Sequence, residues 1–247
     1  MLINVIRNVT IIIYYNTINH KGQVKYMLLQ DKREELIAYG KKAVEYRLTK
    51  GTGGNLSVCD RDSGLMAITP SGIDYFDITP DQIVLIDIES GKIVDGTALP
   101  SSERDMHRIF YKYRTDLNAI IHTHTTFAAT LACLRQPLPA VHYLSALAGG
   151  DVRCAEYATY GTVALAKNAF KAMEDRKAVL LANHGLLAGG SSLADAFNVT
   201  EEIEFCCELY YRTKSIGEPV ILPADEMERM AERFKDYGKK PEEHDEI

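Results

Sequence analysis

The sequence predicts an α/β fold, a three-layer α/β/α sandwich with a largely antiparallel central sheet. Short apolar runs of strand length cluster along the chain, and longer segments with apolar residues at helical spacing flank them. The 247 residues show no internal repeat and no low-complexity linker after Met27. We therefore expect one domain that buries a sizeable core.

The first half of this domain is expected to begin and end with a helix. The helix at 28–48 presents an apolar face made of Leu36, Ile37, Gly40, Ala43, Val44 and Leu48. The strands that follow are expected at 55–59, at 64–70 and on both sides of a hairpin turn at Ser90-Gly91. The segment 100–114 then reads as a helix with Ser101 or Ser102 as its N-cap, since a serine hydroxyl bonds the free amide groups of a helix start.

The second half alternates between strands and helices. Its elements are expected at 119–124 (strand), directly after His124 (helix), 140–143 (strand), 161–173 (helix), on both sides of Asn183-His184-Gly185 (strands), 192–214 (helix) and 225–235 (helix). Strands that cluster between flanking helices in this way indicate helical layers on both faces of one sheet.

The first 26 residues differ in composition from the rest of the chain. They are rich in Ile, Asn and Tyr, lack a signal-peptide cleavage pattern, and hold an apolar run too short to span a bilayer. We expect residues 1–26 to be a non-native or disordered extension, Met27 to be the natural start, and residues 27–247 to form the domain.

Charge and cysteine content exclude several function classes. The formal net charge is −6 and no block of Lys and Arg stands out, so nucleic acid and anionic membranes are poor candidate partners. The five cysteines are odd in number, include the adjacent Cys206 and Cys207, and form no C-x-x-C motif. This usage predicts no disulfide framework and favours the reducing cytoplasm.

Three histidines are the main candidates for chemistry. His122 and His124 are two residues apart at the end of a predicted strand, so both side chains point to one face. On their own they could equally be buried histidines bonded to carbonyl groups or water. His184 adds a third imidazole beside a glycine, and three imidazoles with one open position are the ligand set of a catalytic zinc site.

An acidic group is available near the start of the helix within 100–114. Glu103 is a candidate general base or fourth metal ligand, although acidic residues are also favoured there by the helix dipole alone. His107 follows four residues later on the same helical face, where we expect a supporting partner rather than a ligand.

Three short polar turns could bind a phosphate group without Lys or Arg. They are "GTGGN" (51–55), "TPSG" (69–72) and "PSS" (100–102). Each offers backbone amide groups freed by glycine or by a helix start, and hydroxyl or amide side chains add further donors. A single turn of this kind is weak evidence, but three beside a histidine set are more indicative.

Several motifs occur in an order that is similar to one known family. They are "GTGGNLSV", "ITPSGIDY", "LPSSERDMH", "AIIHTHTTFAATLACL", "LPAVHYLSALAGG", "CAEYATYGT" and "NHGLLAGG". Together they resemble the class II aldolase and ribulose-phosphate 4-epimerase family. The resemblance runs from about Met27 to "FKDYG" near the C-terminal end, so it implies one class II aldolase-like domain over 27–247.

The resemblance also implies roles for individual residues. It makes His122, His124 and His184 the ligands of one Zn²⁺ per subunit and Glu103 the catalytic carboxylate, which can also touch the metal. The residues it places around the substrate phosphate are Asn55, Ser71, Gly72, Ser101 and Ser102. The catalytic tyrosines it implies are Tyr143, acting from a neighbouring subunit of a homotetramer, and Tyr237, in the C-terminal tail. Tyr160 replaces a phenylalanine of the family pattern beside the aldehyde.

These assignments lead to an expected activity. We expect a zinc-dependent lyase that reversibly cleaves L-fuculose 1-phosphate, or a closely related ketose 1-phosphate, to dihydroxyacetone phosphate and L-lactaldehyde. An L-ribulose-5-phosphate 4-epimerase or a sugar-phosphate dehydratase of the family is the alternative, although the epimerases tend to carry Asp at the position of Glu103. A non-catalytic interaction domain like the adducin head would share the fold, but such domains lack the histidine set.

Overall fold

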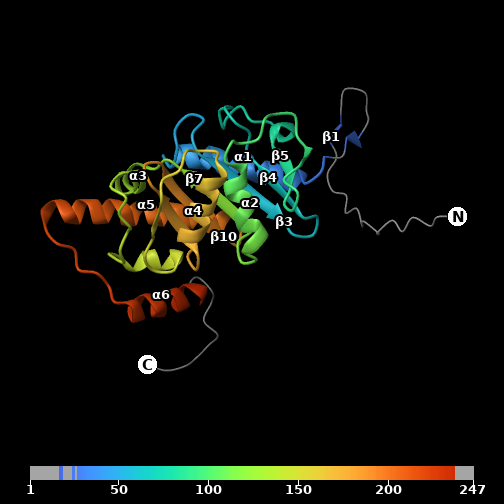
Figure 1. Cartoon of the computed structure of the whole chain (residues 1–247). Helices are drawn as coiled ribbons and strands as arrows, with labels where there is room; N and C mark the ends of the chain where they lie inside the picture. The colour runs from blue at the N-terminus through green and yellow to red at the C-terminus, as the bar shows by residue number, and fades with distance from the viewer. Residues whose placement is uncertain (1–16, 19–23, 26, 237–247) are drawn as a thin grey trace.

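The computed structural model describes residues 17–18, 24–25 and 27–236. Its centre is an eight-stranded sheet in which the pair β8–β9 is parallel and the other pairs are antiparallel. In spatial order the strands are β6 (Ile93–Asp95), β5 (Val84–Asp87), β4 (Leu65–Ile68), β3 (Asn55–Asp60), β7 (Ala119–Thr123), β10 (Gly185–Gly190), β9 (Ala178–Leu181) and β8 (Cys154–Ala155). The long antiparallel run confirms the predicted sheet (Figure 1).

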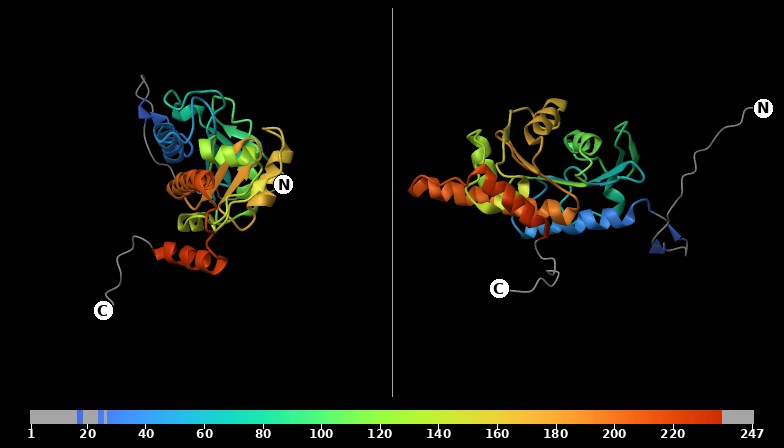
Figure 2. Two further views of the ribbon diagram at one scale, coloured as in Figure 1. Left: turned by 90° about the vertical axis from the view of Figure 1, so that its left-hand side faces the viewer. Right: turned by 90° about the horizontal axis from the view of Figure 1, so that it is seen from below.

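Helices cover both faces of the sheet, as Figure 2 shows. The helices on one face are α1 (Gln30–Glu45), α3 (Thr126–Cys133) and α5 (Leu193–Ile216), and those on the other are α2 (Arg104–Tyr113) and α4 (Val163–Met173). The apolar side chains of the strands pack against α2 and α4 in one core cluster and against α1, α3 and α5 in two others. The three-layer prediction is therefore confirmed.

Three smaller features complete the fold. Helix α6 (Ala224–Asp236) packs against the 3₁₀ helix η2 (Tyr143–Ala148) through the buried Met227. A second 3₁₀ helix, η1 (Pro80–Gln82), precedes β5. Strands β1 (Thr17–Ile18) and β2 (Val24–Lys25) form a separate two-stranded sheet, whereas most of the predicted extension 1–26 lies outside the described residues.

Two local predictions were wrong. The strand expected at 140–143 does not form, because a turn in which the Val141 amide donates to the Pro139 carbonyl leads directly into η2. Helix α2 begins after Glu103, which is itself the N-cap residue. The Ser101 hydroxyl accepts from the Glu103 amide group instead of capping the first turn.

Among the described residues, no helix is long and apolar enough to cross a membrane.

A buried tyrosine contacts the loop before β3. Tyr75 is 2% exposed, and its hydroxyl donates to the Gly53 carbonyl oxygen at 3.3 Å. Its ring lies against Gly40 of α1, where an added Cβ would stand 2.4 Å from the Tyr75 Cδ1 atom. The glycine therefore lets the helix approach the ring that supports the first polar turn.

This contact makes Gly40→Ala destabilising. The same change at an open helix position would stabilise the fold by up to about 1 kcal/mol. Here the overlap with the Tyr75 ring should instead lower the free energy of unfolding by about 1–3 kcal/mol, measured by urea denaturation. In a Tyr75→Leu background the loss should shrink, and an unchanged or raised stability in the wild-type background would contradict the steric role.

Candidate active site

The three candidate histidines meet at one end of the sheet centre. His122 is on β7, opposite Asn55 of β3 and Leu187 of β10, and His124 follows directly after the strand. His184 lies in the turn between β9 and β10. The His122 Nε2 atom is 3.1 Å from the His124 Nε2 atom and 3.2 Å from the His184 Nε2 atom. The sheet thus brings together residues that are 62 positions apart.

Two glycines allow the neighbouring loops to lie against the end of β7. An added Cβ at Gly185 would stand 2.3 Å from the Thr123 carbonyl oxygen. Gly54 has a φ of +71°, and its Cβ would stand 2.5 Å from the His122 carbonyl oxygen. A side chain at either position would push a loop away from the imidazoles.

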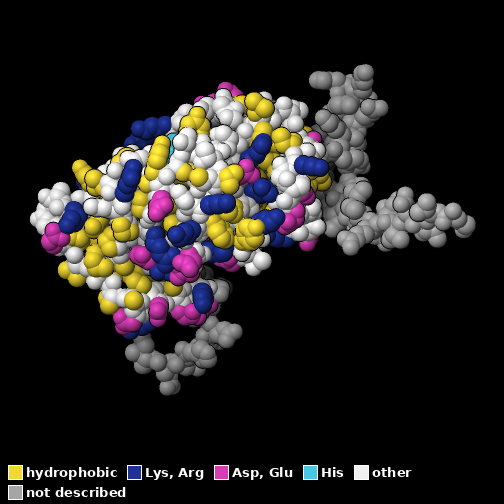
Figure 3. Space-filling view, in the orientation of Figure 1, with side chains coloured by type: hydrophobic (Ala, Val, Ile, Leu, Met, Phe, Trp, Pro, Cys, Tyr) yellow, Lys and Arg dark blue, Asp and Glu magenta, His cyan; other side chains and the backbone are white. Residues whose placement is uncertain are grey.

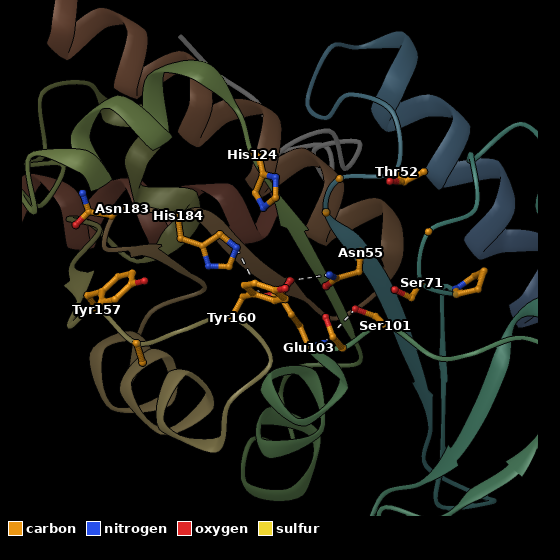
Figure 4. Close-up of a pocket in the computed structure, with 16 residues that line it drawn as sticks. Thr52, Asn55, Ser71, Ser101, Glu103, His124, Tyr157, Tyr160, Asn183 and His184 are labelled. Atoms are coloured by element: carbon orange, nitrogen blue, oxygen red, sulfur yellow. Dashed lines mark hydrogen bonds and ion pairs between the residues drawn. The ribbon is translucent and has the colours of Figure 1, made fainter.

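Glu103 lies beside this histidine cluster. Its Oε2 atom is 3.3 Å from the His122 Nε2 atom, and its Oε1 atom is 3.5 Å from the His184 Nε2 atom. The Asn55 side-chain amide donates to Oε2 at 2.8 Å. The Oε1 atom is buried and has no hydrogen-bond partner among the described residues. Figure 4 shows Glu103 between His184 on one side and Ser71 and Ser101 on the other.

This donor set fits a divalent metal ion. A tetrahedral zinc with Zn–N bonds of about 2.0–2.1 Å holds its imidazole nitrogens about 3.3–3.4 Å apart, close to the separations seen here. The Nδ1 atom of His122 donates to the Leu186 carbonyl oxygen at 2.9 Å, which leaves the Nε2 lone pair facing the cluster. The unpartnered Oε1 atom of Glu103 offers a further oxygen. Metal binding would satisfy groups that the protein leaves facing one another.

The three imidazoles are held in the form that binds metal. Burial lowers the pKa of His122 well below its usual value, and the neighbouring His184 and His124 lower it further. Burial also lowers the pKa of His124 and of His184, although Glu103 opposes this for both. At neutral pH the rings are therefore uncharged, with lone pairs available.

The three polar turns line a pocket of about 410 Å³ in front of these groups. An antiparallel bridge between Pro70 and Pro100 holds "TPSG" and "PSS" side by side, and residues of "GTGGN" line the same pocket. The predicted phosphate-binding residues Asn55, Ser71, Gly72, Ser101 and Ser102 all lie on the pocket wall. The structure thus brings every residue of this predicted set to one cavity.

The opposite wall holds residues that the sequence analysis did not single out. Tyr157 and Asn183 line it together with Tyr160 and Ala158. Asn183 has a φ of +53°, a conformation that asparagine tolerates, and its Oδ1 atom accepts from the Arg135 Nε atom at 3.0 Å. Its position directly before His184 is the one sequence signal that could have indicated it.

Of the two predicted tyrosines, only Tyr143 is among the described residues, and it does not line this pocket. Tyr143 is on η2, 45% exposed, with its ring stacked on that of Phe234 at a centroid distance of 6.1 Å. It is absent from the pocket lining, so any catalytic role would be in another copy of the chain. Tyr237 lies outside the described residues. Both roles stay predictions.

Comparison with known proteins identifies the family. A family model described as Class II Aldolase and Adducin N-terminal domain matches residues 34–211. This chain belongs to that family. The prediction drawn from the ordered motifs is confirmed.

Relatives of this class II aldolase carry enzyme names. It is 55% identical over 212 residues to the 5-deoxy-D-ribulose 1-phosphate aldolase of Bacillus thuringiensis serovar kurstaki, covering 86% of this chain and 99% of the relative. It is 42% identical over 198 residues to the L-fuculose phosphate aldolase of Escherichia coli O6:H1, covering 79% and 90%. A solved structure of an L-fuculose 1-phosphate aldolase matches with a TM-score of 0.83 and 63% identity, covering 85% of this chain and 98% of that one.

These findings establish the enzyme class. The named relatives are aldolases, which are lyases, and this chain is a class II aldolase. The alternative of a non-catalytic interaction domain is therefore excluded. Class II aldolases are zinc-dependent and act on phosphorylated sugars, and the histidine triad could bind a metal ion.

His107 of α2, behind the pocket, should make the stability of the fold depend on pH in the acid range. The side chain is fully buried, and burial lowers its pKa to about 3. The unfolded chain takes up this proton near pH 6.5, so the free energy of unfolding falls as pH decreases from 6.5 toward 3, by up to about 1.4 kcal/mol per pH unit. In chelator-treated protein His107→Gln should reduce this slope by one proton, measured by urea denaturation.

Between pH 7 and 8 the free energy of unfolding should change with pH equally in the wild type and in His107→Gln, because this histidine is neutral there in both the folded and the unfolded state. Equal slopes between pH 4.5 and 6 would contradict the lowered pKa.

Proposed function

We propose that this aldolase cleaves a short deoxyketose 1-phosphate between C3 and C4, giving dihydroxyacetone phosphate and a small aldehyde that ends in a methyl group. The observation that carries the proposal is the pocket itself. It places a buried carboxylate with a free oxygen beside three imidazoles and opposite polar turns without a Lys or Arg among its lining residues.

Two substrates fit this description. L-Fuculose 1-phosphate would release L-lactaldehyde, as the sequence predicts, and a relative and a solved structure bear the name of this activity. 5-Deoxyribulose 1-phosphate would release acetaldehyde, and the relative at 55% identity is named for it. The wall formed by Tyr157, Ala158 and Tyr160 offers apolar surface to the methyl end of either aldehyde.

The polar turns bind the phosphate in this proposal. Ser101 and Ser102 directly precede Glu103, the N-cap residue of α2, whose N-terminal amide groups and dipole favour an anion. Ser71 and Gly72 lie beside them through the Pro70–Pro100 bridge. The Asn55 side chain lines the same cavity, although its amide is bonded to Glu103 in this structure.

His122, His124 and His184, with Glu103 as an additional ligand, would hold one Zn²⁺ per subunit. When bound, the ion supplies a Lewis acid that polarises the ketose carbonyl. The uncharged imidazoles do not neutralise this charge, and the enclosed position of His122 keeps water from that side.

Glu103 moves the C3 proton. Its Oε2 atom is held by Asn55, while Oε1 has no partner and is free to accept. During cleavage the C4 hydroxyl must also lose a proton as the aldehyde forms. Tyr143 of a neighbouring subunit and Tyr237 of the tail are the proposed groups for that transfer.

A homotetramer would bring Tyr143 to a neighbouring pocket. Exposed hydrophobic side chains support an oligomer: Ile216 at the end of α5 is 89% exposed and Val220 after it is 85% exposed. Figure 3 shows hydrophobic side chains gathered over the end of the molecule where α5 ends. The five unpaired cysteines support the cytoplasmic location.

The activity is tested with purified protein and the two ketose 1-phosphates. Dihydroxyacetone phosphate should appear with both, and the ratio of the two kcat/KM values should identify the preferred aldehyde. A chelator should abolish the activity, and Zn²⁺ should restore it. The proposal would be overturned in favour of the epimerase if the protein converts L-ribulose 5-phosphate to its 4-epimer and forms no free dihydroxyacetone phosphate from either ketose 1-phosphate.

Glu103→Gln separates a catalytic carboxylate from a helix-start acid. We expect exchange of the C3 hydrogen of dihydroxyacetone phosphate with solvent to fall about 10²–10⁴-fold, as for loss of a general base. An acid that only complements a helix dipole would contribute about 0.3–1 kcal/mol to stability and nothing to exchange. Zinc content is measured in the same sample, and a zinc-replete variant that exchanges at the wild-type rate would refute the role.

A further inference from the structure

Behind Glu103, buried polar side chains alternate between α2 and β3. From α2 and its N-cap they are Glu103, His107 and Tyr111, and from β3 they are Asn55 and Ser57. We name these five residues the polar ladder. Four residues of helix rise about 6.0 Å and two residues of strand about 6.6 Å, so side chains at these spacings stay in step. All five residues are at most 6% exposed.

The hydrogen bonds from Ser57 to Glu103 can be given one direction. The Asn55 amide nitrogen donates to Glu103, so its Oδ1 atom faces His107 and can only accept. The His107 Nε2 atom, 2.5 Å away, must therefore donate. The Nδ1 atom of the neutral ring is then an acceptor for the Ser57 hydroxyl at 2.6 Å, and the Tyr111 hydroxyl lies 2.7 Å behind Ser57.

The Glu103 carboxylate and this tautomer of His107 both favour the same orientation of the Asn55 amide. If the amide turned over, its oxygen would face the Glu103 carboxylate, and its NH₂ group would face the Nε2–H of His107. Both contacts would be repulsive. The Nε2–H of His107 thus supports the orientation in which a donor faces Oε2, while Oε1 has no hydrogen-bond partner among the described residues.

We propose that His107 is a positioning residue for the Glu103 carboxylate, acting through Asn55 and supported by Ser57 and Tyr111. The inference rests on the proposed function, in which Glu103 moves the C3 proton. Apolar side chains of similar size would fill the space between α2 and β3 without the desolvation penalty of buried polar groups. The polar ladder instead holds one oxygen of the carboxylate and leaves the other directed at the pocket.

Two amide variants of His107 separate positioning from bulk structure. In His107→Gln the amide nitrogen can take the place of Nε2 and still donate to Asn55. In His107→Asn the shorter side chain reaches only the place of Nδ1, so the Ser57 contact is kept and the Asn55 contact is lost. Both variants bury one amide, so they are matched in polarity. Met106→Leu, a buried neighbour on α2, serves as the control.

The readout is solvent exchange of the C3 hydrogen of dihydroxyacetone phosphate, with kcat and KM for cleavage, zinc content and melting temperature measured on the same samples. We expect His107→Asn to lower exchange and kcat about 10–100-fold, with KM and zinc content within twofold. His107→Gln and Met106→Leu should stay within about threefold of the wild type. Ser57→Ala, which removes the donor to Nδ1, should lower exchange in the same direction and covers the case in which His107→Asn does not fold.

A double-mutant cycle completes the test. If His107 acts through the carboxylate, His107→Asn should have no further effect on the residual exchange of Glu103→Gln. Three outcomes would overturn the positioning role. The first is a further loss of exchange in the double variant, and the second is an equal loss of exchange in His107→Asn and His107→Gln. The third is wild-type exchange in both His107→Asn and Ser57→Ala. A wild-type protein that neither cleaves the ketose phosphates nor exchanges the hydrogen would overturn the proposed function instead.

Discussion

The site depends on the antiparallel pairing of β7 with a strand on each of its sides. This pairing sets His122 level with Asn55 of β3 and Leu187 of β10, and it brings the turn that carries His184 to the same end of the sheet. A slip of one residue would turn His122 on β7, and His124 directly after it, to the opposite face. The backbone hydrogen bonds of the central strands therefore determine which side chains line the pocket.

Much of this arrangement could be predicted from local pattern. Period-two spacing put His122 and His124 on one face, and the flanking helices indicated the layers. The polar ladder also has a readable spacing, with Glu103, His107 and Tyr111 at intervals of four. Nothing in the sequence shows that α2 packs on β3, however, because the hydrogen bonds between them join residues about 50 positions apart.

Other features could not be predicted because distant partners override local tendency. Arg33 lies on the inner face of α1 and is fully buried, although an arginine normally indicates an exposed position. Its guanidinium is satisfied by the carbonyl groups of Pro80 and Ile83 and by Asp95, none of which the helix itself supplies. The apolar run at 140–143 similarly reads as a strand, but the turn after Pro139 leads it into η2.

The crowding of three Nε2 atoms has a consequence for the whole molecule. The His122 Nε2 atom lies 3.1 Å from that of His124, 3.2 Å from that of His184 and 3.3 Å from the Glu103 Oε2 atom, so one cation could contact all of these groups. An ion that binds the folded site but hardly binds the unfolded chain stabilises the fold, by about 2.7 kcal/mol at a hundredfold excess over its Kd. A metal bound at this site would thus link the amount of folded enzyme to the free metal concentration.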